Sequence, residues 1–249
     1  MSATVLRAHA LGFGRSPDRR PLFEGLGFDL SAGEVLVLLG RNGAGKTSLL
    51  RALAGFDRPL AGEMLLMDKP LDQWSPAEKA RRMAVMTTER SSLPWWTVRE
   101  VVALGRQPHT GPGGKLRPED EAAVERALER TGIAAFAGQR FDRLSDGEKQ
   151  TVLIARAIAQ ETPLLLLDEP TAHLDFVGRK ACFDLFAKLA REKSAAVLLA
   201  THEVETALGT ADRVLLLDRA HGWHFGTPRE LLRTGALEKA FGPLGGQGR

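Results

Sequence analysis

One short segment limits the fold of this 249-residue chain more than any other. It fits the pattern G-x-x-x-x-G-K-[ST], whose fixed positions here are Gly40, Gly45, Lys46 and Thr47. The apolar run Val35–Leu39 precedes it and a helical pattern follows it from Ser48. A glycine-rich turn of this kind lets backbone amides surround an anion at the start of a helix. The segment therefore predicts a phosphate-binding loop that also includes Arg41, Asn42, Gly43, Ala44 and Ser48.

Two side chains of this loop supply the chemistry that a nucleotide needs. The Lys46 ammonium brings positive charge to the β and γ phosphates, and the Thr47 hydroxyl offers an oxygen ligand to magnesium. We therefore expect ATP and Mg²⁺ as the ligands of the loop.

Further apolar runs indicate the sheet that carries the loop. They have strand length and lack polar alternation, which is typical of parallel strands buried on both faces: Leu164–Leu167, Ala195–Ala200 and Val214–Leu217. Helical patterns lie between them, at Leu49–Ala54, Glu119–Gly132, Gly147–Gln160 and Lys180–Lys193. We expect an α/β fold with a mostly parallel sheet, as a single domain over residues 1–249. Residues 90–150, approximately, show helical patterns without a clear strand and predict an inserted helical subdomain.

Composition excludes several other classes of protein. The net charge of +3 (34 basic minus 31 acidic residues) is too small for a nucleic-acid-binding field, so no nucleic acid partner is expected. The single cysteine excludes a disulfide framework. The N-terminus lacks the pattern of a secretory signal, and no apolar run approaches the length of a membrane span. We expect a protein that works at a membrane only through a partner.

An acidic pair follows the second apolar run. Asp168 and Glu169 come directly after Leu164–Leu167, at the end of a strand where α/β sheets bind ligands. Asp168 can hold magnesium, and Glu169 is then free to polarise the water that attacks the γ-phosphate. This division predicts ATP hydrolysis.

A capping pattern begins the helix that leads into that strand. Ser145 and Glu148 have the S-x-x-E spacing of a capping box. The helix N-terminus offers a second anion site, because its first amides lack partners within the helix.

Together these segments resemble the ATP-binding subunit of ABC transporters, from about Leu11 to Leu232. Residues 144–150 (LSDGEKQ) resemble the signature of that family, residues 168–175 (DEPTAHLD) its second nucleotide motif and D-loop, and His202 its switch histidine. The resemblance implies a RecA-like P-loop NTPase core with an N-terminal antiparallel β portion and an inserted α-helical subdomain.

The resemblance also implies a mechanism. Two copies of the chain bind ATP between the phosphate loop of one and the signature of the other, which comprises Ser145, Asp146, Gly147 and Glu148. Glu169 activates water, His202 contacts the γ-phosphate, and Asp175 carries signals across the interface. Implied partners are transmembrane permease subunits and, indirectly, a substrate-binding protein. The implied location is the cytoplasmic face of the bacterial inner membrane, as a peripheral subunit.

This chain departs from the family pattern in two places. Asp146 and Glu148 replace a glycine and a glutamine and add negative charge beside an expected phosphate site. Closure of the capping box would turn Glu148 away from it. The Q-loop glutamine is also missing, and either Thr88 or Glu89 occupies its position; we favour Glu89, whose carboxylate can reach magnesium or water.

The chain has no tyrosine, although the family commonly stacks adenine on one. Phe13 occupies the corresponding position and keeps an aromatic face, so we expect it to stack on adenine, with Phe23 as the alternative.

Closer resemblance favours an importer. Residues 97–111 look like the helical segment of bacterial importers for iron–siderophore complexes, haem and cobalamin, and the Thr-Glu pair at residues 88–89 suits a subset assigned to iron uptake. The alternatives are an ABC exporter subunit, a non-transport ABC ATPase and a small-molecule P-loop kinase. The exposed pair Trp95 and Trp96 is expected either to contact a permease or to cover the core of the helical subdomain.

Overall fold

The computed structural model describes residues 3–15, 20–88, 94–111, 113–193 and 195–243. The strands are β1 (Thr4–Arg15), β2 (Arg20–Ser31), β3 (Val35–Leu39), β4 (Ala61–Leu66), β5 (Lys69–Pro70), β6 (Met83–Met86), β7 (Leu164–Asp168), β8 (Ala196–Thr201), β9 (Arg213–Asp218) and β10 (Gly222–Gly226). The α-helices are α1 (Lys46–Leu53), α2 (Pro76–Ala80), α3 (Val98–Ala103), α4 (Pro118–Arg130), α5 (Asp146–Ala159), α6 (Phe176–Lys193), α7 (Val204–Thr210), α8 (Pro228–Arg233) and α9 (Ala236–Phe241). Short 3₁₀ helices are η1 (Leu71–Gln73), η2 (Leu104–His109), η3 (Ala134–Phe136) and η4 (Phe141–Arg143).

The central sheet has the order β10-β9-β3-β8-β7-β6. The neighbouring pairs from β9 to β6 are parallel, and only β10 joins antiparallel, as the hairpin partner of β9. Parallel neighbours present their carboxyl ends at one edge, so the segments that follow β3, β7 and β8 lie close together there. The structure confirms the expected α/β fold with a mostly parallel sheet.

Each face of this sheet belongs to a different core. Val35, Val37 and Leu39 of β3 pack in the core that contains α5 and α6. Leu36 and Leu38 pack in the core that contains α1 and the antiparallel sheet. Successive side chains of a strand point to opposite faces, and burial of both faces explains why β3 is an uninterrupted apolar run.

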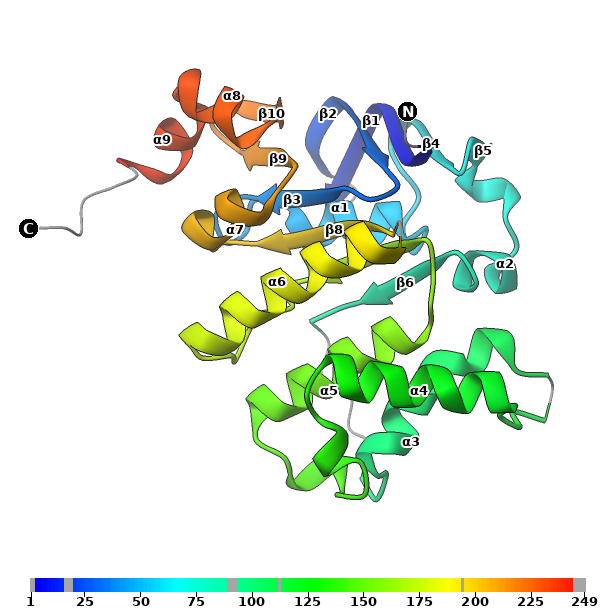
Figure 1. The fold of residues 1–249 in the computed structure, drawn as a ribbon. Helices are drawn as coiled ribbons and strands as arrows, with labels where there is room; N and C mark the ends of the chain where they lie inside the picture. The colour runs from blue at the N-terminus through cyan, green and yellow to red at the C-terminus, as the bar shows by residue number, and fades with distance from the viewer. Residues whose placement is uncertain (1–2, 16–19, 89–93, 112, 194, 244–249) are drawn as a thin grey trace, which may run out of the picture.

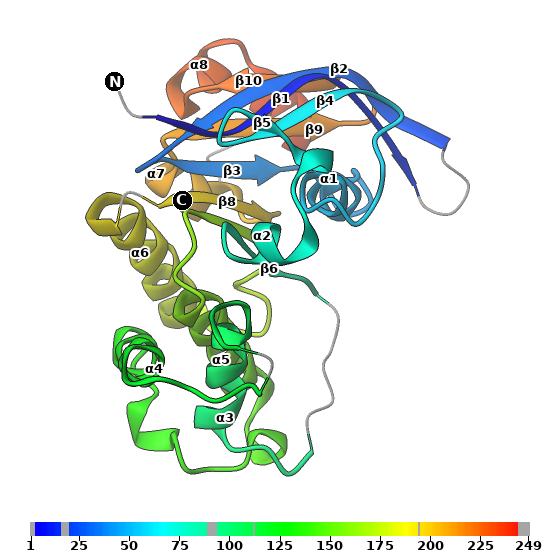
Figure 2. The ribbon, with the colours of Figure 1, turned by 90° about the vertical axis from the view of Figure 1, so that its right-hand side faces the viewer.

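A second sheet covers α1. Its order is β2-β1-β4-β5, and its neighbouring strands are antiparallel. Figure 2 shows this sheet above α1 and the central sheet, and Figure 1 shows α6 on the opposite face. The antiparallel sheet thus corresponds to the N-terminal β portion that the resemblance implies.

The helices between Val98 and Ala159 form a separate group below α6 (Figure 1). A buried ion pair joins them: Arg106 Nε of η2 lies 2.9 Å from Asp120 Oδ1 of α4. Arg106 also donates to the carbonyl of Ala159 at the end of α5, at 2.7 Å. Three helical elements are therefore tied to one guanidinium.

The ends of the helices differ from expectation mainly at α6. The sequence pattern predicts its start at Lys180, but the helix begins at Phe176. The side chain of Asp175 accepts a hydrogen bond from the amide of Gly178 at 2.7 Å, which caps the first turn. Within the described residues, no helix has both the length and the apolar composition to cross a membrane.

The contact between η2 and α5 depends on a glycine. A Cβ on Gly105 would lie 2.2 Å from the carbonyl oxygen of Arg156, which is backbone that has little freedom to move. We expect Gly105→Ala to lower the free energy of unfolding by about 1–3 kcal/mol, because it forces the two helices apart. Urea denaturation followed by circular dichroism measures the change. Gly111→Ala is the control, since a Cβ there meets nothing within 4 Å. Equal midpoints for the two variants would contradict this account of the packing.

Candidate functional site

The predicted phosphate loop connects β3 to α1 and needs its glycines for specific reasons. Gly43 and Gly45 have φ angles of 78° and 109°, in the left-handed region that side chains disfavour. A Cβ on Gly40 would lie 2.8 Å from the carbonyl oxygen of Leu217 in the neighbouring β9. The loop borders a cavity of about 350 Å³, which is lined by Leu22, Asn42, Gly43, Ala44, Gly45, Lys46, Thr47, Ser48, Glu169 and Arg219.

Gly40 and Arg41 do not line this cavity. The Nε of Arg41 instead donates to the carbonyl of Ala240 in α9, at 2.7 Å. The Arg41 guanidinium therefore holds the C-terminal helix, and a contact of Arg41 with the nucleotide stays a prediction for its backbone amide.

Lys46 is held inside the loop. Its Nζ donates to the carbonyl of Gly40 at 2.8 Å and lies 3.3 Å from Glu169 Oε1. The side chain is only 7% exposed. A buried ammonium with two oxygen partners is positioned to exchange one of them for a phosphate oxygen.

Thr47 and Asp168 form the pair expected to hold magnesium. The Thr47 hydroxyl donates to Asp168 Oδ2 at 2.7 Å. The other oxygen, Oδ1, is buried and has no hydrogen-bond partner among the described residues. Burial raises the pKa of the Asp168 carboxyl above its ordinary value, while the hydrogen bond from Thr47 acts in the opposite direction. An orphaned carboxylate oxygen beside a hydroxyl fits a Mg²⁺ ion whose other ligands are water and phosphate oxygens.

Glu169 lies between two groups that are far apart in the sequence. Its Oε1 faces Lys46 Nζ, and its Oε2 lies 3.0 Å from Nδ1 of His202, which follows β8. Glu169 also has a φ of 47°, which is a strained conformation for a residue other than glycine. Two contacts hold this backbone in place: the Glu169 amide donates to Ala200, and Gln150 of α5 donates to the carbonyls of Glu169 and Pro170 at 3.2 and 2.9 Å. The carboxylate is thereby aimed at the cavity.

The predicted capping box at the start of α5 is present. The Ser145 hydroxyl oxygen accepts the Glu148 amide at 3.3 Å, and Glu148 Oε2 accepts the Ser145 amide at 2.8 Å. Hydrogen bonds from the Ser145 hydroxyl and then from its amide lower the pKa of the Glu148 carboxyl. Asp146 lies 3.9 Å from Lys149 Nζ. Both acidic departures from the family pattern therefore have local partners.

The signature and the D-loop meet each other but lie outside the cavity of their own chain. A Cβ on Gly147 would lie 3.0 Å from the carbonyl oxygen of His173, so the start of α5 needs a glycine there. Neither Ser145 nor Asp175 lines the cavity of the phosphate loop.

The segment after β6 gives only part of the Q-loop. Thr88 is exposed, and Glu89 lies outside the described residues. The preceding Thr87 lines a narrow crevice with Thr47 and Asp168. This residue was not among those predicted.

The adenine-stacking prediction is wrong in this conformation. Phe13 is 1% exposed, and its ring stacks on Phe23 with the ring centroids 5.6 Å apart. Phe23 is also buried. Phe13 and Phe23 are paired across β1 and β2, so their rings lie on the same face of the sheet, and that face packs in the core. Leu22 lines the cavity instead, although an edge of each phenylalanine ring lies within 4 Å of the position of a Cβ on Gly45.

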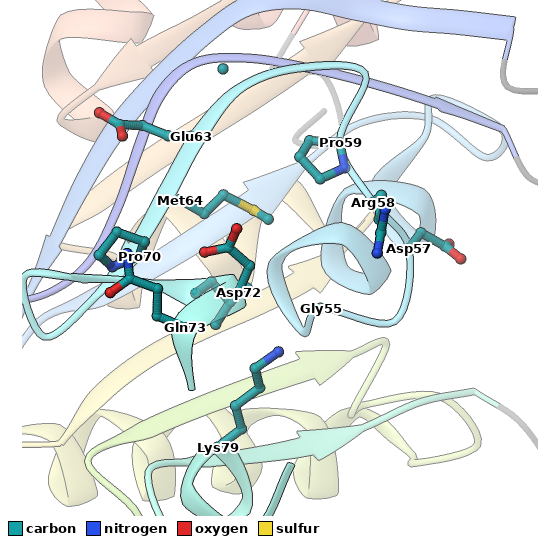
Figure 3. Close-up of a pocket in the computed structure, with 12 residues that line it drawn as sticks. Gly55, Asp57, Arg58, Pro59, Glu63, Met64, Pro70, Asp72, Gln73 and Lys79 are labelled. Carbon is teal, nitrogen blue, oxygen red and sulfur yellow. The ribbon is translucent and has the colours of Figure 1, made fainter. Parts of the chain in front are cut away.

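A larger cavity of about 740 Å³ lies beyond the other end of α1 (Figure 3). Its lining comes from the α1–β4 connection, β4, η1 and α2, and includes Asp57, Arg58, Glu63, Asp72 and Lys79. It contains no residue of the phosphate loop, so it is separate from the nucleotide site.

Two residues that line the cavity lack a recognisable sequence signal: Leu22 in β2 and Arg219 in the turn after β9. Gln150 belongs to the signature-like segment 144–150, but that pattern does not predict its contacts with the carbonyls of Glu169 and Pro170. Their positions follow from tertiary packing, which a local pattern does not encode.

Comparison with known proteins decides the family. A family model described as ABC transporter matches residues 23–172, which is more than half of the chain. The chain belongs to the ABC transporter family.

Several members of the family are similar over most of the chain. The hemin import ATP-binding protein HmuV of Streptomyces coelicolor is 42% identical over 244 residues, which cover 96% of this chain and 82% of the relative. The cobalamin import ATP-binding protein BtuD of Halobacterium salinarum is 39% identical over 209 residues, 84% of this chain and 52% of that protein. A solved structure assigned to the metal-chelate type of ABC transporters, in an inward-facing conformation, has a TM-score of 0.83 and 31% identity, and the alignment covers 96% of this chain and 89% of the solved one.

The buried Asp168 generates a prediction about stability. We expect Asp168→Asn to stabilise the nucleotide-free and metal-free protein at pH 7, because it removes a buried negative charge, and to abolish Mg²⁺-dependent ATP binding. The pKa of Asp168 is raised by folding, so its protonated form is favoured in the folded state. The gain in the free energy of unfolding of Asp168→Asn over the parent should be absent below the pKa of an unfolded aspartate, about 3.9. It should grow as the pH rises from there to the higher pKa of Asp168 in the folded protein.

Urea unfolding between pH 4 and pH 8 measures this difference. Asp184→Asn on the exposed face of α6 is the control and should track the parent. A variant at position 168 that is less stable than the parent at pH 7 would contradict the assignment.

Proposed function

We propose that this chain is the ATP-hydrolysing subunit of an ABC importer for a haem, cobalamin or iron–siderophore substrate. The observation that carries the ATPase assignment is the position of Glu169, between Lys46 Nζ and His202 Nδ1 and next to the Thr47–Asp168 pair. These groups come from the carboxyl ends of three adjacent parallel strands.

The residues at the cavity have different roles in ATP hydrolysis. The loop amides and Lys46 bind the phosphates, and Lys46 gives up its contact with Glu169 as it does so. That exchange frees Glu169 to accept a proton from the attacking water, while His202 orients toward the γ-phosphate. Thr47 and Asp168 would hold Mg²⁺, which supplies charge neutralisation at the β and γ phosphates when it is bound.

A second copy of the chain completes the site. Ser145 and the N-terminus of α5 lie outside the cavity of their own chain, so they contact nucleotide only across an interface. Next to Asp175, Phe176 is 75% exposed, and Val177 is similarly exposed. Neighbouring apolar side chains in solvent favour a contact surface at this point. We infer a head-to-tail homodimer with two ATP molecules between the subunits.

The permease subunits require a docking surface of their own. Trp95 is 75% exposed, with the Arg140 guanidinium 4.1 Å from its ring centroid. Phe56 is also exposed, and its chain neighbours Gly55 and Asp57 line the cavity of Figure 3. Large exposed aromatic side chains favour protein contacts. These two surfaces are where we place the permease, at the cytoplasmic face of the inner membrane.

The importer assignment and its substrate class are supported by the relatives. HmuV and BtuD are named for hemin and cobalamin import, and the solved structure is of the metal-chelate type. All three descriptions concern large metal chelates, which matches the resemblance of residues 97–111.

The base assignment is testable by a single substitution. We expect Glu169→Gln to lower kcat for ATP by a factor of about 10²–10⁴, because the amide cannot accept the proton of water. ATP binding should persist and a nucleotide-bound dimer should accumulate, as size-exclusion chromatography would show. Glu129→Gln, on the exposed face of α4, is the matched control and should keep the parental rate. Parental turnover in the position-169 variant would exclude Glu169 as the base.

The substrate class is testable with the assembled transporter. We expect co-purification with permease subunits, and a several-fold stimulation of ATP hydrolysis by a substrate-binding protein loaded with haem, cobalamin or a ferric siderophore. Reconstituted vesicles should take up the same chelate in the presence of ATP. Export from the vesicles, or stimulation only by an unrelated solute, would contradict the importer assignment.

A further inference from the structure

Among the residues that the structure describes, no aromatic side chain lines the nucleotide cavity. Phe13 and Phe23 are buried in the core, and the intervening residues 14–22 (GRSPDRRPL) contain no aromatic residue. Apart from the phosphate loop and Glu169, the described residues that line the cavity are Leu22 and Arg219.

The tertiary structure brings these two side chains to the same cavity. Arg219 follows β9, whose Leu217 carbonyl packs against Gly40 at the start of the loop. Leu22 lies in β2, with its Cδ1 3.1 Å from the position of a Cβ on Gly45. A hydrogen bond links β2 to β10, the hairpin partner of β9: Trp223 Nε1 of β10 donates to the carbonyl of Glu24 in β2, at 3.2 Å.

The turn that carries Arg219 is fixed by its neighbours. Asp218 accepts the amide of Ala220 at 2.9 Å and lies 2.7 Å from Nδ1 of His221. Arg219 itself is exposed and makes no salt bridge with any residue that the structure describes. A held turn with a guanidinium directed at the nucleotide cavity is suited to a ligand rather than to stability.

We propose that Arg219 and Leu22 bind the nucleobase of ATP in place of an aromatic residue, with the guanidinium of Arg219 stacked on the base. This inference rests on the proposed ATPase function. An aliphatic side chain and a planar cation both pack against the face of a purine. The phosphates already have Lys46, the loop amides and the Thr47–Asp168 pair. Leu22 offers nothing to a phosphate, so the pair of Leu22 and Arg219 suits the base.

Substitutions at position 219 separate stacking from a charge contact with phosphate. We expect Arg219→Ala and Arg219→Lys each to weaken binding of ATP and of ADP by about tenfold, equally for both nucleotides. Lysine keeps the charge but loses the planar group. Arg219→Trp should restore affinity to within about threefold of the parent, because the indole supplies a stacking face.

The binding assay is displacement of a fluorescent ATP analogue from the full chain in the presence of Mg²⁺. Inorganic tripolyphosphate serves as a competitor without a base, and its affinity should be the same in the parent and in Arg219→Ala. Arg229→Ala, an exposed arginine of α8 that does not line the cavity, is the control and should bind as the parent does.

Three results would overturn the inference: parental ATP affinity in Arg219→Ala, recovery of affinity in Arg219→Lys, or a tenfold loss of tripolyphosphate binding in Arg219→Ala. The second and third would indicate a phosphate contact. A parent protein that binds no ATP would overturn the proposed function as well. If the parent binds and hydrolyses ATP but substitutions at position 219 leave ATP affinity unchanged, the proposed function stands and only this inference fails.

Discussion

The parallel pairing of β3, β7 and β8 is the constraint on which the rest of the molecule depends. In this register Leu39 lies opposite Thr201, and Asp168 lies opposite Ala200. The phosphate loop, Glu169 and His202 therefore leave the sheet at one edge. Burial of both faces of these strands fixes the register, because a slip of one residue would exchange the side chains that face the two cores. The burial that stabilises the core therefore also fixes the geometry of the site.

The sequence identifies those parts of the site that depend on local chemistry. Gly40 is predictable because a Cβ there would meet the carbonyl of Leu217, and Gly43 and Gly45 because their positive φ disfavours side chains. Asp168 and Glu169 are predictable because they follow a buried strand. The capping box at Ser145 is predictable because its spacing alone creates it.

Phe13 shows where such reasoning fails. Its place in the chain matches that of a stacking residue, but whether its ring faces the core or the cavity is decided by the pairing of β1 with β2 and by Phe23. Alternation along a strand moves a side chain from one face to the other with each residue, so a match in sequence position alone does not determine the face. The same limit applies to Arg219, which reaches the cavity because β9 lies beside β3.

Gln150 connects the sheet edge that carries Glu169 to the group of helices below it. The residue belongs to α5, whose N-terminus carries the signature, and its side-chain amide holds the carbonyls of Glu169 and Pro170. The left-handed conformation of Glu169 is costly for a glutamate and persists only where its surroundings impose it. Any rotation of α5 relative to the sheet would strain or release these two hydrogen bonds. The orientation of these helices is thereby coupled to the aim of the Glu169 carboxylate, which the proposed function makes the base for the attacking water.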